Sequence, residues 1–429
     1  MTGTAGSRAG VSRGSMAIAA FSTVVEWYDF TLYLYLATVL ARVFFGGGAG
    51  GLIAALAGFA AAYLLRPLGA IVFGHVGDRF GRRRTLLLSV AVMTMAMLLT
   101  GLLPTRAGIG AAAAWLLFLL RCVMGFSVGG EYSAVVAYLL EGAAPGRRGL
   151  VASLASAASE IGGLLAVGVT ALTVGAMGTA DLDAWGWRIP FLVGAALAGS
   201  VWIARAMMQE SPDFERQRAD GTVPGNPLHH TLARHRAGIL RAFAISALGS
   251  ITYYVGITYV PAFLTSTGVL GEGQSLWLGT VAAMAVILVT PVTGWLSDRL
   301  GRKPVLLVLA GCSALLPVVL FHAMARGLHA PAYALAGAVI LACLAGAVSA
   351  VGAAATAEQF PGEGRLSGLA LGMTSATAIF GGLTPYAAQV LMRWTGSPAI
   401  PGVMIAVVAV CVLPVLGAMP ETRPRAEPS

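Results

Sequence analysis

Long apolar runs follow one another along almost the whole chain, separated by short polar segments. Runs of roughly 18 to 25 residues are long enough to cross the hydrocarbon core of a bilayer as helices. Because backbone polar groups within a bilayer must find their partners inside the protein, this pattern predicts an all-α polytopic membrane protein. We place twelve transmembrane helices near residues 16–40, 52–74, 85–103, 111–140, 149–176, 187–208, 239–265, 276–297, 304–325, 331–357, 367–392 and 400–419.

The composition fits helices packed in a lipid bilayer. Only 10% of the residues are charged and 57% are hydrophobic, whereas a soluble domain has about a quarter of its residues charged. The 56 glycines are spread along the chain, as expected where helices must approach one another closely. The net charge of +9 comes from clusters in short loops, without the aromatic-interleaved basic domain that would suggest a nucleic-acid partner.

No pattern in the sequence suggests an enzyme or a cofactor. The four cysteines lie inside apolar runs without paired or CxxC spacing, and no histidine spacing matches a structural zinc site. No nucleotide-binding loop is found, which argues against direct drive by ATP. We therefore expect no metal, no cofactor and no catalytic residue, and we disfavour a membrane enzyme or a receptor.

The basic residues predict the orientation in the membrane. If both ends of the chain lie on the same side of the membrane, the segments on that side hold 20 of the 27 Lys and Arg residues. The segments on the other side hold five. Basic loops stay in the cytoplasm, so we expect a multi-pass protein of the cell membrane with both termini cytoplasmic.

Two halves with matching loops are indicated. The longest polar interval, 209–238, separates an N-terminal six-helix half (1–208) from a C-terminal half (239–429). The loop "GHVGDRFGRRRTLLL" at Gly74 is echoed by "GWLSDRLGRKPVLL" at Gly294, and "EGAAPGRRG" at Glu141 by "EQFPGEGRLSG" at Glu358. Parallel repeats of this kind enclose a substrate site near the bilayer midplane. We expect one monomer to form the pathway.

The repeated loop G-x-x-x-D-R-x-G-R-R resembles the cytoplasmic signature of the major facilitator superfamily. It comprises Gly74, Asp78, Arg79, Gly81, Arg82 and Arg83, with Asp298, Arg299 and Arg302 in the second copy. The resemblance implies a gate in which Gly74 lets helices touch, Asp78 faces the positive end of a neighbouring helix, and the arginines pair with a carboxylate such as Glu141. The alternative is that these arginines only anchor the topology.

Further segments resemble the metabolite–proton symporter family within that superfamily. They are "EWYDFTLY", "RCVMGFSVGGEYSAVVAYLLE", "WGWRIPF", "ESPDFE" and "FGGLTP". The resemblance implies proton-coupled import of a small metabolite by alternating access. "VGGEYS" (128–133) and "ITYYVGITYVPAFL" (251–264) are most similar to proline/betaine symporters, which favours an osmolyte. "GGEY" is shared with carboxylate carriers of the family, so α-ketoglutarate or citrate stays an alternative.

Ionisable residues at membrane depth are candidates for proton coupling. Glu26 and Asp29 are three positions apart and share one face of the first helix, and Glu131 follows two glycines in the fourth. The alternative is that Glu26 or Asp29 neutralises Arg66 or Arg121, or that Arg121 and Glu131 belong to a buried structural salt bridge to the first helix. Glu160, in the fifth helix, is a further and weaker candidate.

The substrate-binding candidates are one arginine and four tyrosines. Arg121 offers a planar set of donors to a substrate carboxylate, and Tyr28 and Tyr132 lie in the same half. Tyr253 and Tyr254 offer ring faces to a quaternary ammonium group, or else pack as structural residues.

Overall fold

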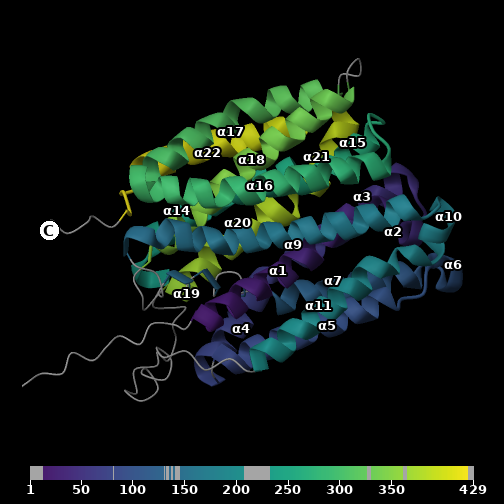
Figure 1. Ribbon diagram of the computed structural model, residues 1–429, viewed down its shortest axis with the longest axis horizontal. Coiled ribbons are helices and arrows are strands. Elements are labelled where there is room, and N and C mark those ends of the chain that lie inside the picture. Colours follow the sequence, from purple (N-terminus) through teal and green to yellow (C-terminus); the bar gives the residue numbers. More distant parts are fainter. Residues whose placement is uncertain are drawn as a thin grey trace, which may run out of the picture.

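The computed structural model describes residues 13–80, 82–129, 131, 135–136, 139–140, 145–206, 232–325, 330–360 and 365–423. Within these ranges the chain is a bundle of helices that run along one common axis (Figure 1). We call the end where α1 begins and α22 finishes the terminal end, and the other the opposite end.

The first half contains a series of helices up to residue 206. They are α1 (Arg13–Tyr35), α2 (Ala37–Phe45), α3 (Gly48–Tyr63), α4 (Arg66–Phe80), α5 (Arg82–Gly101), α6 (Arg106–Ile109), α7 (Ala112–Ser127), η1 (Pro145–Arg147), α9 (Arg148–Ala176), α10 (Thr179–Asp181), η2 (Leu182–Gly186) and α11 (Arg188–Ala206). The predicted boundary of this half, residue 208, lies just outside the described residues.

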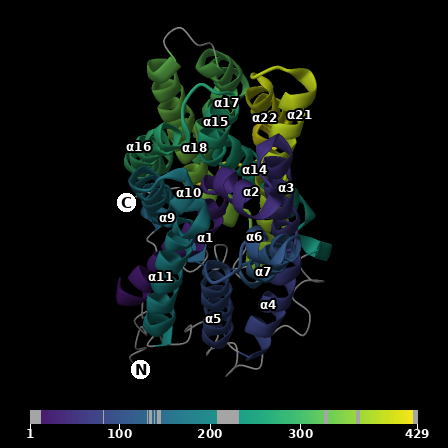
Figure 2. The same cartoon turned by 90° about the vertical axis from the view of Figure 1, so that its right-hand side faces the viewer.

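The second half resumes with α14. Its helices are α14 (Arg236–Tyr253), η3 (Tyr254–Thr258), α15 (Val260–Ser266), α16 (Glu272–Leu300), α17 (Arg302–Ala325), α18 (Ala330–Ala357), α19 (Arg365–Leu369), η6 (Ala370–Thr374), α20 (Ser375–Thr377), η7 (Ala378–Gly382), α21 (Thr384–Thr395) and α22 (Ile400–Ala418). Viewed along the bundle axis, the two halves form two stacked groups (Figure 2).

The described helices match the twelve predicted apolar runs. Eight helices are long and apolar enough to span a membrane, and the helix pair 21–35 and 37–45, bent by 64°, makes a ninth. Leu87–Gly101 and Ala112–Ser127 are shorter apolar helices, and the segment 365–395 supplies the remaining run. Large apolar side chains such as Leu288, Leu315 and Trp394 stay exposed on the bundle, as a lipid-facing surface requires.

Three of the predicted runs are interrupted rather than continuous. The first bends at Leu36, the seventh contains the π-helical turn η3, and the eleventh contains two such turns, η6 and η7. π-helical turns loosen the regular hydrogen bonding of a helix and are frequent at functional sites. Two of the three, η3 and η6, contribute residues to the cavity described below.

Glycines set the closest helix contacts of the first half. A Cβ atom on Gly129 would lie 2.1 Å from the Arg66 carbonyl oxygen, and one on Gly162 would lie 2.3 Å from that of Val24. No larger side chain fits at either position, so the backbones touch there. These contacts hold the start of α4 against the end of α7, and α9 against α1.

Candidate functional site

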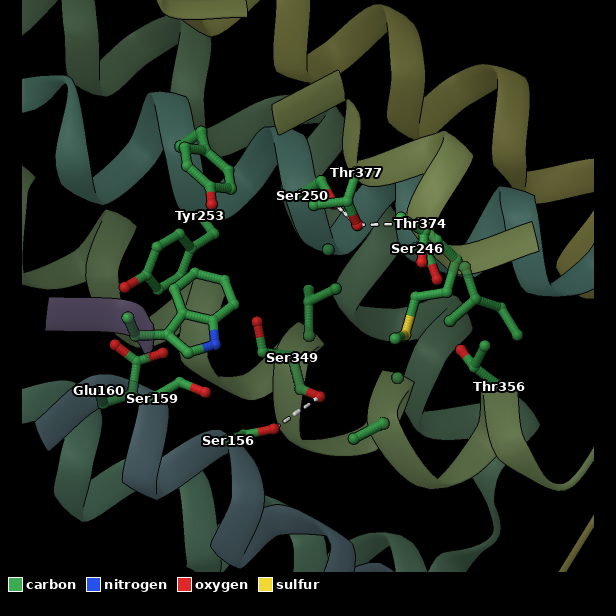
Figure 3. A pocket seen from close by; sticks show the side chains of 18 of the residues that line it. Ser156, Ser159, Glu160, Ser246, Ser250, Tyr253, Ser349, Thr356, Thr374 and Thr377 are labelled. Atoms are coloured by element: carbon green, nitrogen blue, oxygen red, sulfur yellow. Dashed lines mark hydrogen bonds between the residues drawn. The ribbon is translucent and has the colours of Figure 1, made fainter. Parts of the chain in front are cut away.

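A cavity lies between the two halves of the bundle. Its walls come from α1, α4 and α9 of the first half and from α14, α18 and the interrupted helix 365–395 of the second. The residues that line it are Trp27, Arg66, Gly129, Ser156, Ser159, Glu160, Ile245, Ser246, Gly249, Ser250, Tyr253, Tyr254, Val348, Ser349, Gly352, Ala353, Thr356, Met373, Thr374 and Thr377. Figure 3 shows that hydroxyl groups from both halves gather around this space.

Toward the opposite end, a layer of aromatic rings joins the two halves beside the cavity. Trp27 packs edge-on against Tyr253 with ring centroids 4.9 Å apart, and Tyr63 packs against Tyr254 at 5.5 Å. The Tyr63 and Tyr254 hydroxyls are also hydrogen-bonded to each other. Because each contact joins one half to the other, this layer is a candidate gate between the cavity and the opposite end.

Toward the terminal end the two halves meet in an apolar cluster. A buried cluster joins side chains from both halves: Val135, Val136, Leu139, Leu140, Ala152 and Ala155 with Ala242, Ala353, Ala354, Ala357, Phe360 and Leu369. The Thr374 hydroxyl donates to the Gly129 carbonyl oxygen at 3.3 Å beside it. The cavity therefore lies between an aromatic and an aliphatic layer.

Arg66 connects the cavity to a carboxylate behind its wall. Its guanidinium forms a salt bridge of 2.5 Å with Glu26 and a hydrogen bond with the Tyr63 hydroxyl. The guanidinium carbon also lies 4.4 Å from the centroid of the Phe30 ring. Glu26 is fully buried, and its Oε2 accepts no hydrogen bond from the described residues. The predicted alternative, that a carboxylate of the first helix neutralises Arg66, is therefore observed.

Asp29 and Arg121 form a second buried pair, outside the cavity wall. Arg121 donates to Asp29 at 2.9 Å and to the Thr100 hydroxyl at 3.3 Å. The guanidinium lies 5.7 Å from the ring centroids of Tyr33 and Phe191. All these partners belong to the first half, so the structure does not bring Arg121 to the cavity where we expected it to bind substrate.

Glu131 forms the third buried pair, near the terminal end. Arg205 donates to it at 2.6 Å and also to the Ser22 hydroxyl, and the Ser89 hydroxyl lies 3.4 Å from its other oxygen. This network ties Glu131, which follows α7, to α1, α5 and α11 within the first half. The predicted alternative of a salt bridge to the first helix is not observed for Glu131, because its partner is Arg205 of α11 and the first helix contributes only the Ser22 hydroxyl.

The predicted tyrosines separate into two groups. Tyr253 and Tyr254 line the cavity, as expected. Tyr28 instead donates to the Pro190 carbonyl oxygen at 2.7 Å and packs at Gly194 of α11, away from the cavity, because the helical turn places it on a different face from Trp27. Tyr132 lies outside the described residues.

Glu160 is the one carboxylate among the residues that line the cavity, and Arg66 is the one cation. Its side chain comes from α9, next to Ser159, and lies across the cavity from Ser246, Thr374 and Thr356 (Figure 3). Glu160 is only 2% exposed. It has no ion pair and no hydrogen bond with any other residue in the described part of the chain.

The second copy of the signature loop forms contacts of the kind that the sequence predicts for Asp78 and the arginines of the first copy. Asp298 accepts hydrogen bonds from the Gly149 and Leu150 amides, at 2.9 and 2.8 Å, at the N-terminus of α9 in the other half. Arg302 pairs with Asp298 at 2.8 Å and with Glu358 at 3.3 Å. Arg299 takes no part in these ion pairs and stacks on Trp295 at 4.0 Å. The alternative that all these arginines only anchor the topology does not hold for Arg302.

The first copy is described only as backbone. Gly74, Asp78 and Arg79 lie in α4, and Arg82 and Arg83 lie in α5. Gly81 and Glu141 lie outside the described residues. Their role in a gate stays a prediction.

At the opposite end, a basic residue joins the halves. Arg42 pairs with Asp183 at 3.0 Å in its own half and with Glu272 at 3.3 Å in the other, and Thr38 also bonds to Glu272. These residues belong to no motif in the sequence, where they stand as isolated charges near helix ends, so we did not expect them to join the halves.

The hydroxyl lining was missed for a similar reason. Ser250 and Thr377 are hydrogen-bonded to each other at 3.0 Å, and Ser156 donates to the Ser349 carbonyl oxygen at 3.3 Å. Serine and threonine are common in transmembrane helices, so their presence alone carries no signal. A spacing of three or four, as in Ser246 and Ser250, is the only pattern that would have pointed to a shared face.

Comparisons with known proteins agree with this architecture. The family model described as "Major Facilitator Superfamily" matches residues 19–323 and 270–429. The ectoine/proline transporter ProP of Corynebacterium glutamicum is 33% identical over 94% of this chain and 85% of its own length. The α-ketoglutarate permease of Escherichia coli K12 is 34% identical over 86% of this chain and 85% of its own. The citrate-proton symporter of Klebsiella pneumoniae is 30% identical over 96% and 92%.

A solved structure has the same fold. The proton:xylose symporter XylE bound to a bromodeoxyglucose superimposes with a TM-score of 0.77 over 96% of both chains, at 18% identity. The arrangement is therefore the twelve-helix fold with two six-helix halves that the sequence predicted.

Proposed function

The chain belongs to the major facilitator superfamily of transporters, and from this premise we propose that it is a proton-coupled symporter that imports a small zwitterionic osmolyte by alternating access. Proline and glycine betaine are the proposed substrates, since 33% identity links the chain to an ectoine/proline transporter and 30% to a proline/betaine transporter of Escherichia coli K12.

The observation that carries the proposal is the position of Arg66, which pairs with Glu26 and also lines the cavity. A proton on Glu26 removes the negative charge that holds Arg66. The freed guanidinium then binds a substrate carboxylate with its fork of donors. An unpaired cation in a poorly solvated site is costly, so Arg66 requires either ionised Glu26 or the substrate as its partner.

This exchange couples the two flows. While Glu26 is still ionised, the Glu26 carboxylate and the substrate carboxylate compete for the same guanidinium, and the repulsion between these two anions is strong in the low dielectric of the bundle. In the empty carrier, in contrast, Glu26 and Arg66 form a neutral pair. Proton and substrate therefore cross together, and neither crosses alone at a comparable rate.

The link from Arg66 to the gate passes through Tyr63. Arg66 holds the Tyr63 hydroxyl, which in turn bonds to Tyr254 of the other half. When Arg66 turns toward the substrate, this hydrogen-bonded chain is altered at the aromatic layer. We infer that substrate binding changes the opening of the cavity at the opposite end through this chain of hydrogen bonds.

Import of a carboxylate such as α-ketoglutarate is the second candidate. It is favoured by the 34% identity to an α-ketoglutarate permease and by the presence of a cation in the cavity. A dicarboxylate, however, brings a second negative charge into a cavity whose lining has one cation and one carboxylate.

We further propose that the protein lies in the cell membrane with the terminal end cytoplasmic, because twenty of its 27 basic residues belong to that side. The cavity has walls from both halves of one chain, which supports function as a monomer.

The test is uptake into proteoliposomes with an imposed pH gradient, acidic outside, using labelled proline, glycine betaine, α-ketoglutarate and citrate. We expect the two zwitterions to accumulate. Accumulation of the carboxylates alone would refute the substrate assignment. Accumulation that survives collapse of both the pH gradient and the membrane potential would refute proton coupling.

A further inference from the structure

We propose that Glu160 binds the positively charged nitrogen of the substrate and thereby selects zwitterions over carboxylates. The inference rests on the proposed function and adds to it a residue that decides the substrate class. The observation behind it is that Glu160 is a buried carboxylate that faces the cavity without a cation partner in the described part of the chain.

The other buried carboxylates of the first half differ from Glu160 in this respect. Glu26, Asp29 and Glu131 are each paired with an arginine, at 2.5, 2.9 and 2.6 Å. Buried carboxylates in proteins are normally compensated in this way. Since no residue of the described chain compensates Glu160, its negative charge is favourable only when a cationic group, such as that of the transported molecule, lies beside it.

The surroundings of Glu160 suit an ammonium group. Trp27 and Tyr253 line the same cavity and pack against each other, and a Cβ atom on Gly163, one turn along α9, would lie 3.2 Å from the Tyr253 hydroxyl. Aromatic rings attract ammonium groups, including quaternary ones that have no N–H donors. The hydroxyls across the cavity in Figure 3 can accept hydrogen bonds from a secondary ammonium such as that of proline.

The charges then balance within the loaded cavity. Arg66 takes the substrate carboxylate, protonated Glu26 is neutral, and Glu160 takes the nitrogen. A dicarboxylate in the same place would face Glu160 with like charge, which is a repulsive element that discriminates against it. Position 160 thus separates the two candidate functions that the relatives leave open.

The test uses pairs of molecules that differ only in this charge. 3,3-Dimethylbutyrate has the shape of glycine betaine with carbon in place of the nitrogen, and cyclopentanecarboxylate stands in the same relation to proline. Inhibition constants are measured against substrate counterflow in proteoliposomes without a pH gradient, so that binding is read apart from proton drive. Wild-type protein is expected to prefer each zwitterion over its carbon analogue by at least about tenfold.

The variant Glu160→Gln keeps the size of the side chain and removes its charge. We expect it to lose most of that preference and to bind α-ketoglutarate more tightly than wild type does. Glu160→Asp, which keeps the charge, should retain the preference. Asp181→Asn is the matched control, because Asp181 is an exposed carboxylate in α10 and lies outside the cavity lining.

Several outcomes would overturn the inference. One is an unchanged preference in Glu160→Gln; another is normal preference with loss of pH-driven accumulation only, which would make Glu160 a proton carrier. Wild-type protein that binds each carbon analogue as tightly as the zwitterion would overturn it without any variant, even if Glu160→Gln does not fold. Zwitterion preference that depends on Glu160 but without accumulation in a pH gradient would leave this inference intact and refute the proposed symport.

Discussion

Arg66 forms a 2.5 Å salt bridge with Glu26 on one side and lines the central cavity on the other. Its partner is fully buried and has an oxygen, Oε2, without a hydrogen bond from the described residues. One guanidinium can therefore respond to a proton on the carboxylate and to an anion in the cavity. Much of the expected behaviour of the carrier follows from this arrangement.

Replacement of Glu26 by Gln should uncouple transport from protons. The amide imitates a permanently protonated carboxylate, so Arg66 stays free for the substrate and the empty carrier cannot return with a neutral pair. Substrate counterflow should continue, whereas accumulation driven by a pH gradient should fall to background. If this variant accumulated substrate as well as wild type does, Glu26 would have only a structural role.

Replacement of Asp29 by Asn should act on stability instead. It leaves Arg121 buried and uncompensated, which costs about 3–5 kcal/mol in other proteins. We expect a clearly lower midpoint of thermal unfolding in detergent, and partial recovery when Asp29→Leu is combined with Arg121→Met. If Asp29→Asn is as stable as wild type but no longer accumulates substrate, Asp29 rather than Glu26 is the proton site.

In a double-mutant cycle, the effects of removing the Tyr63 and Tyr254 hydroxyls on the transport rate should not add, because both hydroxyls belong to one hydrogen bond. Tyr63→Phe and Tyr254→Phe each remove it, so the double variant should be no slower than the slower single variant. The coupling energy from exchange rates should be about 0.5–3 kcal/mol, the range for residues in direct contact. Additive effects would mean that the two hydroxyls act independently.

Asp298→Asn should weaken the contact between the halves at the terminal end. The carboxylate accepts two amide hydrogen bonds at the N-terminus of α9, where a negative charge is favoured. Loss of that charge is expected to cost about 1–2 kcal/mol, measured by thermal unfolding. The exposed Asp181→Asn serves as control and should unfold as wild type does.

The C-terminal segment should detach in acid because of Glu421. Burial raises the pKa of this carboxyl, but amide hydrogen bonds from Arg423, Arg302 and Lys303, together with the Arg302 charge, outweigh burial and hold the pKa below its usual range. A lowered pKa gives a stabilisation that is full above the unfolded value, about 4.3, and is lost as the pH falls through the folded value.

A spin label at Pro420→Cys can follow this detachment. It should stay immobile from pH 8 to about pH 5 and become mobile at lower pH, below the usual glutamate pKa. Combination with Glu421→Gln should make it mobile at neutral pH. Mobility that already rises near pH 6 would point to a different group.

The sequence determined the architecture, because bilayer thickness fixes helix length and a repeated loop reveals two halves. The repeat also marked Asp298 as a gate candidate. The sequence predicts a contact with a helix N-terminus only for Asp78 of the first copy, and the structure shows such a contact for Asp298. Local pattern suffices for the helices and the loops, since each depends on residues close together in the chain, whereas the Asp298 contact joins residues 149 positions apart.

Only the tertiary structure decided which charges belong together. Glu26 and Asp29 share a helix face, yet one meets Arg66 and the other Arg121, 40 and 92 residues away. Those pairings depend on how closely α1, α4 and α7 approach at glycine contacts such as Gly129, which spacing along one helix does not specify. By the same packing Glu160 faces the cavity while Arg121 is enclosed, because helix rotation and distance, rather than residue type, decide which charges a substrate can meet.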